Sequence, residues 1–528
     1  MTELLVKNAF VIDPLNGIRG EVMDIAVRDG WIVESVGDGA EVIDAAGCLT
    51  LPGGIDSHTH ICGTKVNFGR YMMPEDMRAG RTQRRGVMHS TSGYSVPTTY
   101  GNSYRYCAMG YTSVLEGAMA PLEARHTHEE FAATPLQDTM ANTLFDGNWP
   151  VMEAVRDGDV TRAAAIVAWT LAAVKGFAIK LTNPGGSECW GWGKNVHCIR
   201  ETVPYFGVSP AEIIQTLIRA NEMLRLPHSV HLHCNNLGVP GNYTCTIGSM
   251  DLAPDLNPDR QSLYLTHVQF HAYGGTSWKD ICSKAEPVAY TVNRKPQITI
   301  DMGQMMFGKT TTMTADGPME FNLYRLHHNK WSNHDVELET TSGIIPVYYS
   351  RTSVVNCVMW AIGLELALLV KNPWQCLLAT DNPNGGPFIK YPEIIALLMS
   401  RRYREEELKT LAPGTHSRIT LPSDIAIYPI RVDKTDPSRQ YREVIQAFQK
   451  TAWTVKRGRP VARDGEILVP GVNKTIWARA KVREDLDMGR DPEFARNFDR
   501  YYTVRMSNYP VQDVYLQRSL CMESEAQL

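Results

Sequence analysis

Residues 51–60 read Leu51-Pro52-Gly53-Gly54-Ile55-Asp56-Ser57-His58-Thr59-His60, a short apolar strand that ends in a His-x-His pair. Residues i and i+2 of an extended strand point to the same side, so the rings of His58 and His60 can bind one metal ion at the end of the strand. A chain with 15 histidines also produces such pairs by chance. The pair therefore indicates a metal site only when further ligand candidates accompany it.

A second His-x-His pair, His126 and His128, has a different setting. Thr127 followed by Glu130 is typical of a capping box that opens a helix. We therefore expect a structural role for this second pair.

Lys180 is the next ligand candidate along the chain. The Ala-rich stretch 161–175 predicts a helix that Gly176 ends, and a short apolar strand then leads into Lys180. Burying an ammonium group is costly, whereas a neutral amine there could react with carbon dioxide and form a carbamate that bridges two divalent ions. The alternative is an ordinary surface lysine beside a turn.

The third candidate follows a helix with a clear start signal. Ser209-Pro210-Ala211-Glu212 combines an N-cap serine, a proline at the first helical position and a capping-box glutamate, and the helix should reach about Leu226. The strand after it contains both His231 and His233. We expect His233, nearer the strand's end, to be the ligand, with His231 as its substitute or as a hydrogen-bonding neighbour of the ligands.

Two more candidates complete an ordered series. His267 ends the β-rich run 263–267, and Asp381 follows the apolar strand 376–380, which comes after a predicted helix over 354–371. Each candidate is weak alone. The order His-x-His, Lys, His, His, Asp, with each member at the end of a strand, predicts one metal centre at the mouth of a barrel.

This series resembles that of the amidohydrolase superfamily, whose barrel carries two histidines on strand 1, a carboxylated lysine on strand 4, histidines on strands 5 and 6 and an aspartate on strand 8. The resemblance narrows to the family of formylmethanofuran dehydrogenase A subunits and covers most of residues 1–400. The corresponding family from the bacterial formyltransferase/hydrolase complex shares the plan, but segments 124–131 and 188–193 are more similar to the dehydrogenase family. The segments that carry the resemblance are 52–60, 65–70, 183–186, 231–238, 266–271 and 380–388.

The residues and the resemblance together imply a binuclear zinc site. Its expected ligands are His58, His60, carboxylated Lys180, His233 and His267. Asp381 is expected to take a proton from the attacking water and pass it to the leaving nitrogen. The resemblance implies N-formylmethanofuran as the amide, with methanofuran as carrier, and other subunits as partners, among them a tungsten- or molybdenum-dependent subunit that generates formate.

Four further residues are candidates for substrate contacts because they lie near the strand ends: Asn67, Arg70, His231 and Asn235. Polar residues that fix loops are the alternative. For the whole chain, the alternatives are a formylmethanofuran hydrolase subunit of a formyltransferase/hydrolase complex, a dihydropyrimidinase-like cyclic amidohydrolase and a non-catalytic scaffold subunit. The segments after strands 1, 5 and 8 argue against the cyclic amidohydrolase, and the complete ligand series argues against the scaffold.

We expect an α/β fold, a (β/α)8 TIM-like barrel with a small β-domain built from both chain ends. The expected boundaries are 1–50 for the first part of the β-domain, 51–415 for the barrel, 416–475 for the second part of the β-domain, and 476–528 for an extension that could form a subunit interface. An Asp29-Gly30 hairpin turn supports β-structure in the first part, and the runs 423–428 and 451–458 do so in the second.

Composition limits the remaining function classes. A formal net charge of −4 offers no electrostatic footprint for nucleic acid. The longest apolar stretch, 354–370, carries Asn356 and Glu365 and is read as a buried helix rather than a membrane span. The 11 cysteines have no regular spacing, which is typical of reduced thiols and not of an iron–sulfur site. Without a secretory signal at the start, we expect a cytoplasmic protein.

Overall fold

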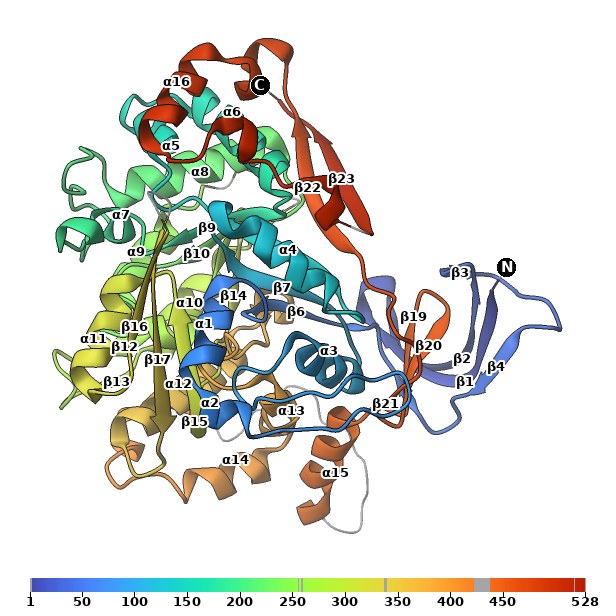
Figure 1. Ribbon diagram of the computed structural model, residues 1–528. Helices are drawn as coiled ribbons and strands as arrows, with labels where there is room; N and C mark the ends of the chain where they lie inside the picture. The colour runs from blue at the N-terminus through green and yellow to red at the C-terminus, as the bar shows by residue number, and fades with distance from the viewer. Residues whose placement is uncertain are drawn as a thin grey trace.

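Eight parallel strands form a nearly closed barrel in the computed structural model of the chain, which describes residues 2–254, 256–257, 260–336, 340–421, 437–516 and 518–527 (Figure 1). An isolated parallel bridge from Thr59 to Asn382 joins the first strand to the segment after the last. The barrel fold expected from the sequence is confirmed. The strands are β6 (Gly54–Thr59), β7 (Tyr111–Met119), β8 (Asp138–Leu144), β9 (Ala178–Thr182), β10 (Val230–His233), β11 (Leu263–Leu265), β14 (Ile298–Asp301) and β18 (Cys376–Leu377).

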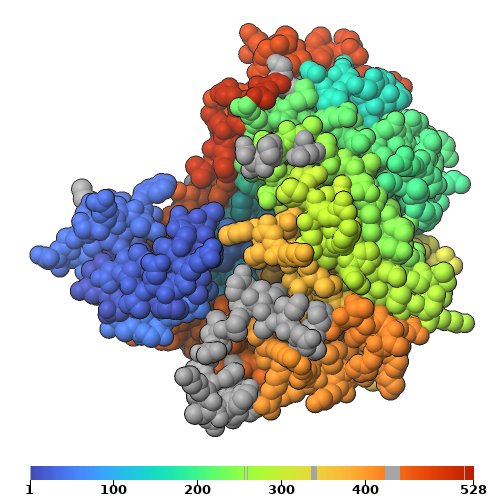
Figure 2. Space-filling model, turned by 180° about the vertical axis from the view of Figure 1, so that it is seen from behind, coloured from blue at the N-terminus to red at the C-terminus, as the bar shows by residue number. Residues whose placement is uncertain are grey.

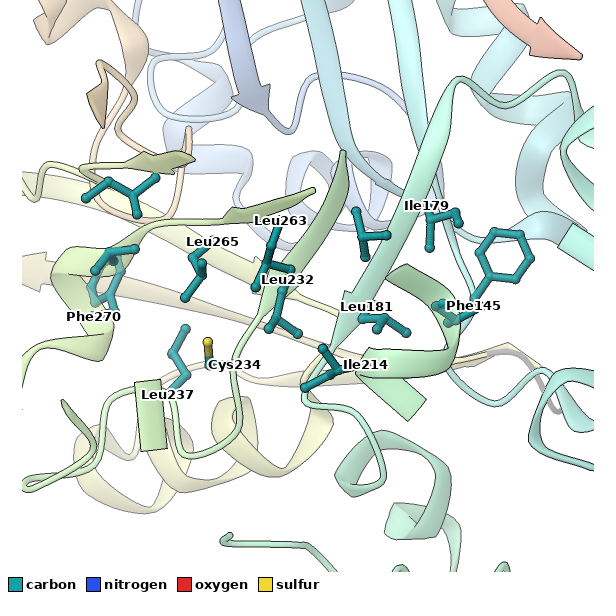
Figure 3. Packing of buried hydrophobic residues seen from close by; sticks show 14 of the residues in the cluster. Phe145, Ile179, Leu181, Ile214, Leu232, Cys234, Leu237, Leu263, Leu265 and Phe270 are labelled. Carbon is teal, nitrogen blue, oxygen red and sulfur yellow. The ribbon is translucent and has the colours of Figure 1, made fainter. Parts of the chain in front are cut away.

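Alternation along the strands separates the core from the site. In β9, Ile179 and Leu181 point away from the barrel axis and pack toward the surrounding helices, as Leu232 of β10 and Leu265 of β11 do (Figure 3). Their neighbours, such as Lys180, therefore face the barrel interior. The apolar layer fixes the register that brings the polar side chains together.

Helices alternate with these strands and cover the barrel. The capping box predicted at Ser209 is present, with its hydroxyl accepting from the backbone N–H of Glu212. Helix α6 ends one residue earlier than predicted, because Lys175 rather than Gly176 adopts the left-handed conformation at its end. The covering helices are α1 (Thr64–Met72), α2 (Pro74–Met77), α3 (Thr99–Ala108), α4 (Ala124–Ala132), α5 (Trp149–Arg156), α6 (Val160–Val174), α7 (Gly186–Cys189), α8 (Pro210–Leu224), α9 (Tyr243–Asp251), α10 (Ala285–Asn293), α12 (Val354–Leu369), α13 (Tyr391–Met399) and α14 (Arg401–Leu408).

The capping box predicted at Thr127 is wrong. A 3-10 turn at Pro121–Glu123 leads directly into α4, so Thr127 lies inside that helix, where its hydroxyl donates to the carbonyl of Glu123. The structural role expected for the pair is seen for His128, which is buried with Nε2 2.9 Å from the carbonyl oxygen of Val174.

A small antiparallel sheet and one helix cover the barrel mouth. They are inserted between β14 and α12 and comprise β15 (Gly308–Thr314), α11 (Gly317–His327), β16 (Ser332–Val336) and β17 (Thr340–Tyr349). The backbone N–H of Met313 donates to Oδ1 of Asn384, which ties this cover to the loop after β18. The ligand-bearing ends of the strands therefore lie beneath a lid of secondary structure.

Both ends of the chain contribute to a β-layer beside the barrel, which Figure 2 shows as a projecting lobe at the N-terminal end. Leu4, Val27 and Ile43 of the first sheet share an apolar cluster with Trp453 and Val455. The Asp29-Gly30 turn predicted from the sequence is present, with φ of 50° and 90°. The run 423–428 lies outside the described residues. The first sheet contains β1 (Glu3–Asp13), β2 (Ile18–Arg28), β3 (Trp31–Val33), β4 (Glu41–Asp44) and β5 (Leu49–Thr50), and the second β19 (Trp453–Lys456), β20 (Arg459–Arg463) and β21 (Glu466–Ile467).

The last segment of the chain wraps the outside of the barrel. Strand β22 (Thr475–Lys481) pairs with the start of β8 and then with β23 (Ser519–Glu525), and α16 (Pro492–Tyr501) packs Phe494 and Phe498 against Trp169 of α6. Helix α15 (Pro437–Gln449) lies against α13. Among the described residues, every helix is too short or too polar to cross a membrane.

Candidate metal centre

The predicted ligands from strands 1 and 8 meet at the barrel mouth. Oδ1 of Asp381 lies 3.4 Å from Nε2 of His58 and 3.2 Å from Nε2 of His60. All three side chains are buried. Their ligand atoms lie within 4.8 Å of one another, close enough for one metal ion.

A second group lies beside the first. His233, His267 and His271 are buried, and each offers a ring nitrogen within 4.8 Å of the others. The rings of His58 and His267 are 5.4 Å apart, centroid to centroid, so the two groups are adjacent. Sequence reasoning selected His233 and His267 but missed His271, although it follows His267 by only four residues.

Lys180 lies in the same interior. Its Nζ donates to Oγ1 of Thr266 at 3.2 Å, and the side chain is buried. Burial lowers the pKa of this amine to about 8, although Asp381, Asp301 and Asp146 act in the opposite direction. A substantial neutral fraction is the form of an amine that can add to carbon dioxide.

Carboxylates orient the histidines from behind. Nδ1 of His58 is 3.0 Å from Asp301, Nδ1 of His60 is 2.9 Å from Glu116, and Nε2 of His233 is 3.2 Å from Asp316. A ring N–H donated to a carboxylate leaves the other nitrogen unprotonated and fixed in direction, as a metal ligand requires. Sequence reasoning missed these carboxylates. The Asp at the end of the apolar strand 298–301 is one signal that could have revealed Asp301.

Burial also adjusts the charge of the rings. It lowers the pKa of His58, His233 and His267, which favours the neutral imidazole. For His60, burial acts in the same direction, but hydrogen bonds to Asp381 and Glu116 outweigh it and raise the pKa. The first three rings are therefore in the protonation state that binds a metal.

Several buried polar atoms at this site have no partner among the described residues. They include Nδ1 of His267 and both ring nitrogens of His271. Unpaired buried polar groups are costly, and a cluster of histidine nitrogens with a carboxylate is a donor set that suits zinc and similar divalent ions. The residues present therefore fit a metal centre.

The four predicted substrate contacts are engaged in contacts with the protein itself. Arg70 donates to Asn67, to Glu130 and to the carbonyl oxygens of Ile61 and Pro97. These bonds fix the loop after β6. Asn67 also lies 2.5 Å from Nε2 of His126.

Asn235 and His231 are fully buried and lie outside both ligand groups. Nδ2 of Asn235 donates to Asn183 and to the carbonyl of Pro184. The His231 ring stacks on Tyr264 at 4.1 Å, and its Nδ1 lies 3.1 Å from Asn142. The structure thus brings His233, and not His231, into the ligand cluster, and it favours the loop-fixing interpretation for these polar residues.

The amidohydrolase family model matches residues 41–456, which include the barrel and every predicted ligand. The chain belongs to the amidohydrolase family. Among curated relatives of this amidohydrolase, Protein FwdA of Methanocaldococcus jannaschii is 46% identical, with 97% of each chain covered. The resemblance to the formylmethanofuran dehydrogenase family expected from the sequence is thereby confirmed.

A second relative and a solved structure point to the neighbouring branch of the family. The matching component of the formyltransferase/hydrolase complex Fhc from Methylorubrum extorquens is 31% identical over 88% of the amidohydrolase chain and 89% of its own. The crystal structure of that FhcABCD complex with methylofuran contains a chain that superposes with a TM-score of 0.88 at 27% identity, with both chains fully covered.

Proposed function

We propose that this chain is the amidohydrolase subunit that interconverts N-formylmethanofuran with formate and methanofuran at two zinc ions. The observation that carries the proposal is the convergence of two buried ligand groups, His58, His60 and Asp381 beside His233 and His267, in a chain similar over its whole length to Protein FwdA. A relative's structure solved with methylofuran supports the type of substrate.

The small size of the site cavity supports a one-carbon acyl group. The cavity lined by His233, Phe270, Met319, Glu320 and Asp381 has a volume of about 20 Å³, enough for about one water-sized group. A formyl group meets this limit, whereas larger acyl groups would require the lid to move.

The metal ions would be held by His58, His60, His233, His267 and Lys180 as its carbamate. When bound, they supply Lewis-acid chemistry that polarises the formyl carbonyl and lowers the pKa of an attacking water. The neutral histidine rings bind through the nitrogens that their carboxylate partners leave unprotonated.

Asp381 would move the proton. Nδ2 of Asn384 donates to its Oδ2 at 2.8 Å, which holds the carboxylate in place. Oδ1 has no hydrogen-bond donor of its own among the described residues and points at the ligand histidines. In this position Asp381 can accept a proton from the attacking water and return it to the leaving nitrogen, and the same groups run the reaction toward amide formation.

The second candidate is a hydrolase subunit of an Fhc-type complex. Identity of 46% to Protein FwdA against 31% to the Fhc relative favours the dehydrogenase-type assembly. We propose that the chain works with a tungsten- or molybdenum-containing subunit that supplies formate. Purification of the native complex followed by elemental analysis distinguishes the two, because only the first assembly contains tungsten or molybdenum.

The direct test of the activity is formate release. The zinc-loaded chain is incubated with N-formylmethanofuran and formate is quantified. Formate production that stops when the zinc is removed supports the proposal. A zinc-loaded chain that releases no formate, alone or in its native complex, contradicts it.

A further inference from the structure

Glu320 is a buried carboxyl that the proposed mechanism leaves without a role. It lies in the first turns of α11, on the lid, with no exposed surface, and it lines the same small cavity as His233 and Asp381. Neither of its oxygens forms an ion pair with a cationic side chain among the described residues. An acidic side chain in this position requires an explanation, because burying it without a partner is costly.

The contacts of Glu320 indicate which oxygen is free. Oε2 lies 3.1 Å from Oγ1 of Thr312, while Oε1 is buried without a hydrogen-bond partner among the described residues. Oγ1 of Thr312 also lies 3.1 Å from the carbonyl oxygen of Ile345. A threonine hydroxyl has only one hydrogen. If it is donated to the carbonyl, Oε2 must carry its own proton and donate it to Thr312.

A neutral Glu320 agrees with its surroundings. Burial raises the pKa of this carboxyl well above its usual value, and the nearby carboxylates of Asp316 and Asp381 act in the same direction. In the neutral form, Oε2–H donates to Thr312 and Oε1 is a carbonyl oxygen. The cavity then contains a fixed acceptor that lacks a donor.

The occupant of the cavity must supply that donor. In a formamide R–NH–CHO the only donor at the reacting end is the N–H, because the formyl oxygen and a formate anion are acceptors only. The lining beside Glu320 includes Leu237, Phe270 and Met319, which offer no donor. An N–H directed at Oε1 would also set the position of the scissile nitrogen relative to Asp381.

We propose that Glu320 recognises the substrate nitrogen: its Oε1 accepts a hydrogen bond from the N–H of the formamide, and from the amine in the reverse direction. This inference rests on the proposed function and assigns specificity for an amide over an ester. Glu320 thereby orients the nitrogen that Asp381 protonates.

The test compares two substrates that differ only in that N–H. One is N-formylmethanofuran, and the other is the formate ester in which oxygen replaces the N–H. For Glu320→Leu, kcat/KM for the amide should fall about 10- to 100-fold, the range expected for loss of one buried hydrogen bond, while the ester should change less than about threefold. Zinc content and thermal unfolding are measured on each variant, so that a damaged fold is recognised.

Two further variants make the test specific. Glu320→Gln should keep the amide preference, because its NH2 group can donate to Thr312 while its Oε1 remains an acceptor. Trp331→Phe is the matched control, because the indole Nε1 of Trp331 is a buried donor without a partner among the described residues and lies outside the cavity lining. It should leave the ratio of amide to ester turnover unchanged.

The outcomes separate this inference from the proposed function. If the wild-type chain does not cleave the amide, the proposed function fails. If it does, and Glu320→Leu lowers both substrates equally, the inference is overturned. It is also overturned if Glu320→Gln loses as much preference as Glu320→Leu, because a carboxylate would then be required, or if Trp331→Phe reproduces the loss, because Glu320 would then be bonded to Trp331.

Discussion

Nδ1 of His60 lies 2.9 Å from Oε1 of Glu116, and this contact determines that Nε2 of His60 faces Asp381. The other oxygen of Glu116 accepts from the backbone N–H groups of Ile61 and Cys62. The carboxylate therefore holds both the ring and the loop that follows it. Control of the ligand histidines from one layer behind them is the central structural feature of this site.

The first prediction concerns that layer. Glu116→Gln should weaken zinc binding about 10- to 100-fold, because the amide is a poorer acceptor for the ring N–H and no longer stabilises the ligand tautomer. Chelator competition measures the affinity. Glu123→Gln, a change on the loop after β7, is the control and should bind zinc as the wild type does. Equal affinities for Glu116→Gln and the wild type would show that Glu116 does not support the ligand.

Lys180→Ala should reduce the zinc content from about two ions per chain toward one or none, because the proposed carbamate bridge is lost. Elemental analysis of the purified variant measures this. Lys456→Ala is a suitable control, because Lys456 is another buried lysine but its Nζ lies 3.0 Å from Asp138, at the small β-layer. Two ions retained without Lys180 would show that this lysine is no bridge.

Asp381→Asn should keep zinc bound but lower kcat for formate release by about two to four orders of magnitude, the usual contribution of a positioned acid or base. The substitution preserves the size of the side chain and removes its basicity. Zinc content and turnover are measured on the same preparation. Undiminished turnover would remove the proton-transfer role assigned to Asp381.

Gly117 is required to make room for two ligands. A Cβ at this position would lie 2.5 Å from Cδ2 of His58 and 2.8 Å from Cε1 of His60. Gly117→Ala should therefore displace the rings and lower zinc content and activity together. Gly191→Ala, where the added carbon meets no atom within 4 Å, is the matched control. An active, zinc-loaded Gly117→Ala protein would contradict the tight packing described here.

His128 should make stability depend on pH. Burial lowers its pKa from 6.5 to about 4 in the folded chain, so between these values the unfolded chain binds more protons. Stability should consequently fall as the pH drops from about 6.5 to about 4, by up to about 3 kcal/mol from this residue. Urea unfolding of the wild type and of His128→Gln at pH 7 and pH 4.5 tests this. The two proteins should differ in their loss of stability, and an identical loss would contradict the assignment.

The ligand series could be predicted from sequence because each member ends its own short strand or the run that follows it. Lys180, His233 and Asp381 each follow a local pattern of helix, apolar strand and polar residue. That pattern carries the barrel architecture with it, because parallel strands present their carboxyl ends at one mouth.

The supporting residues could not be predicted in the same way. Asp301 contacts His58 across 243 residues, and no local pattern encodes such a pairing. Glu320 lies on an inserted lid whose placement depends on contacts such as that between Met313 and Asn384. The wrong capping box at Thr127 has a local cause, since the turn at Pro121–Glu123 already starts the helix.

Titration of the metal-free chain with zinc, with formate release from N-formylmethanofuran recorded at each step, tests the central claim most directly. Activity should rise and level off at two zinc ions per chain, and the Lys180→Ala variant should not reach that plateau. Full activity at one ion per chain, or formate release without any metal, would contradict the binuclear amidohydrolase site.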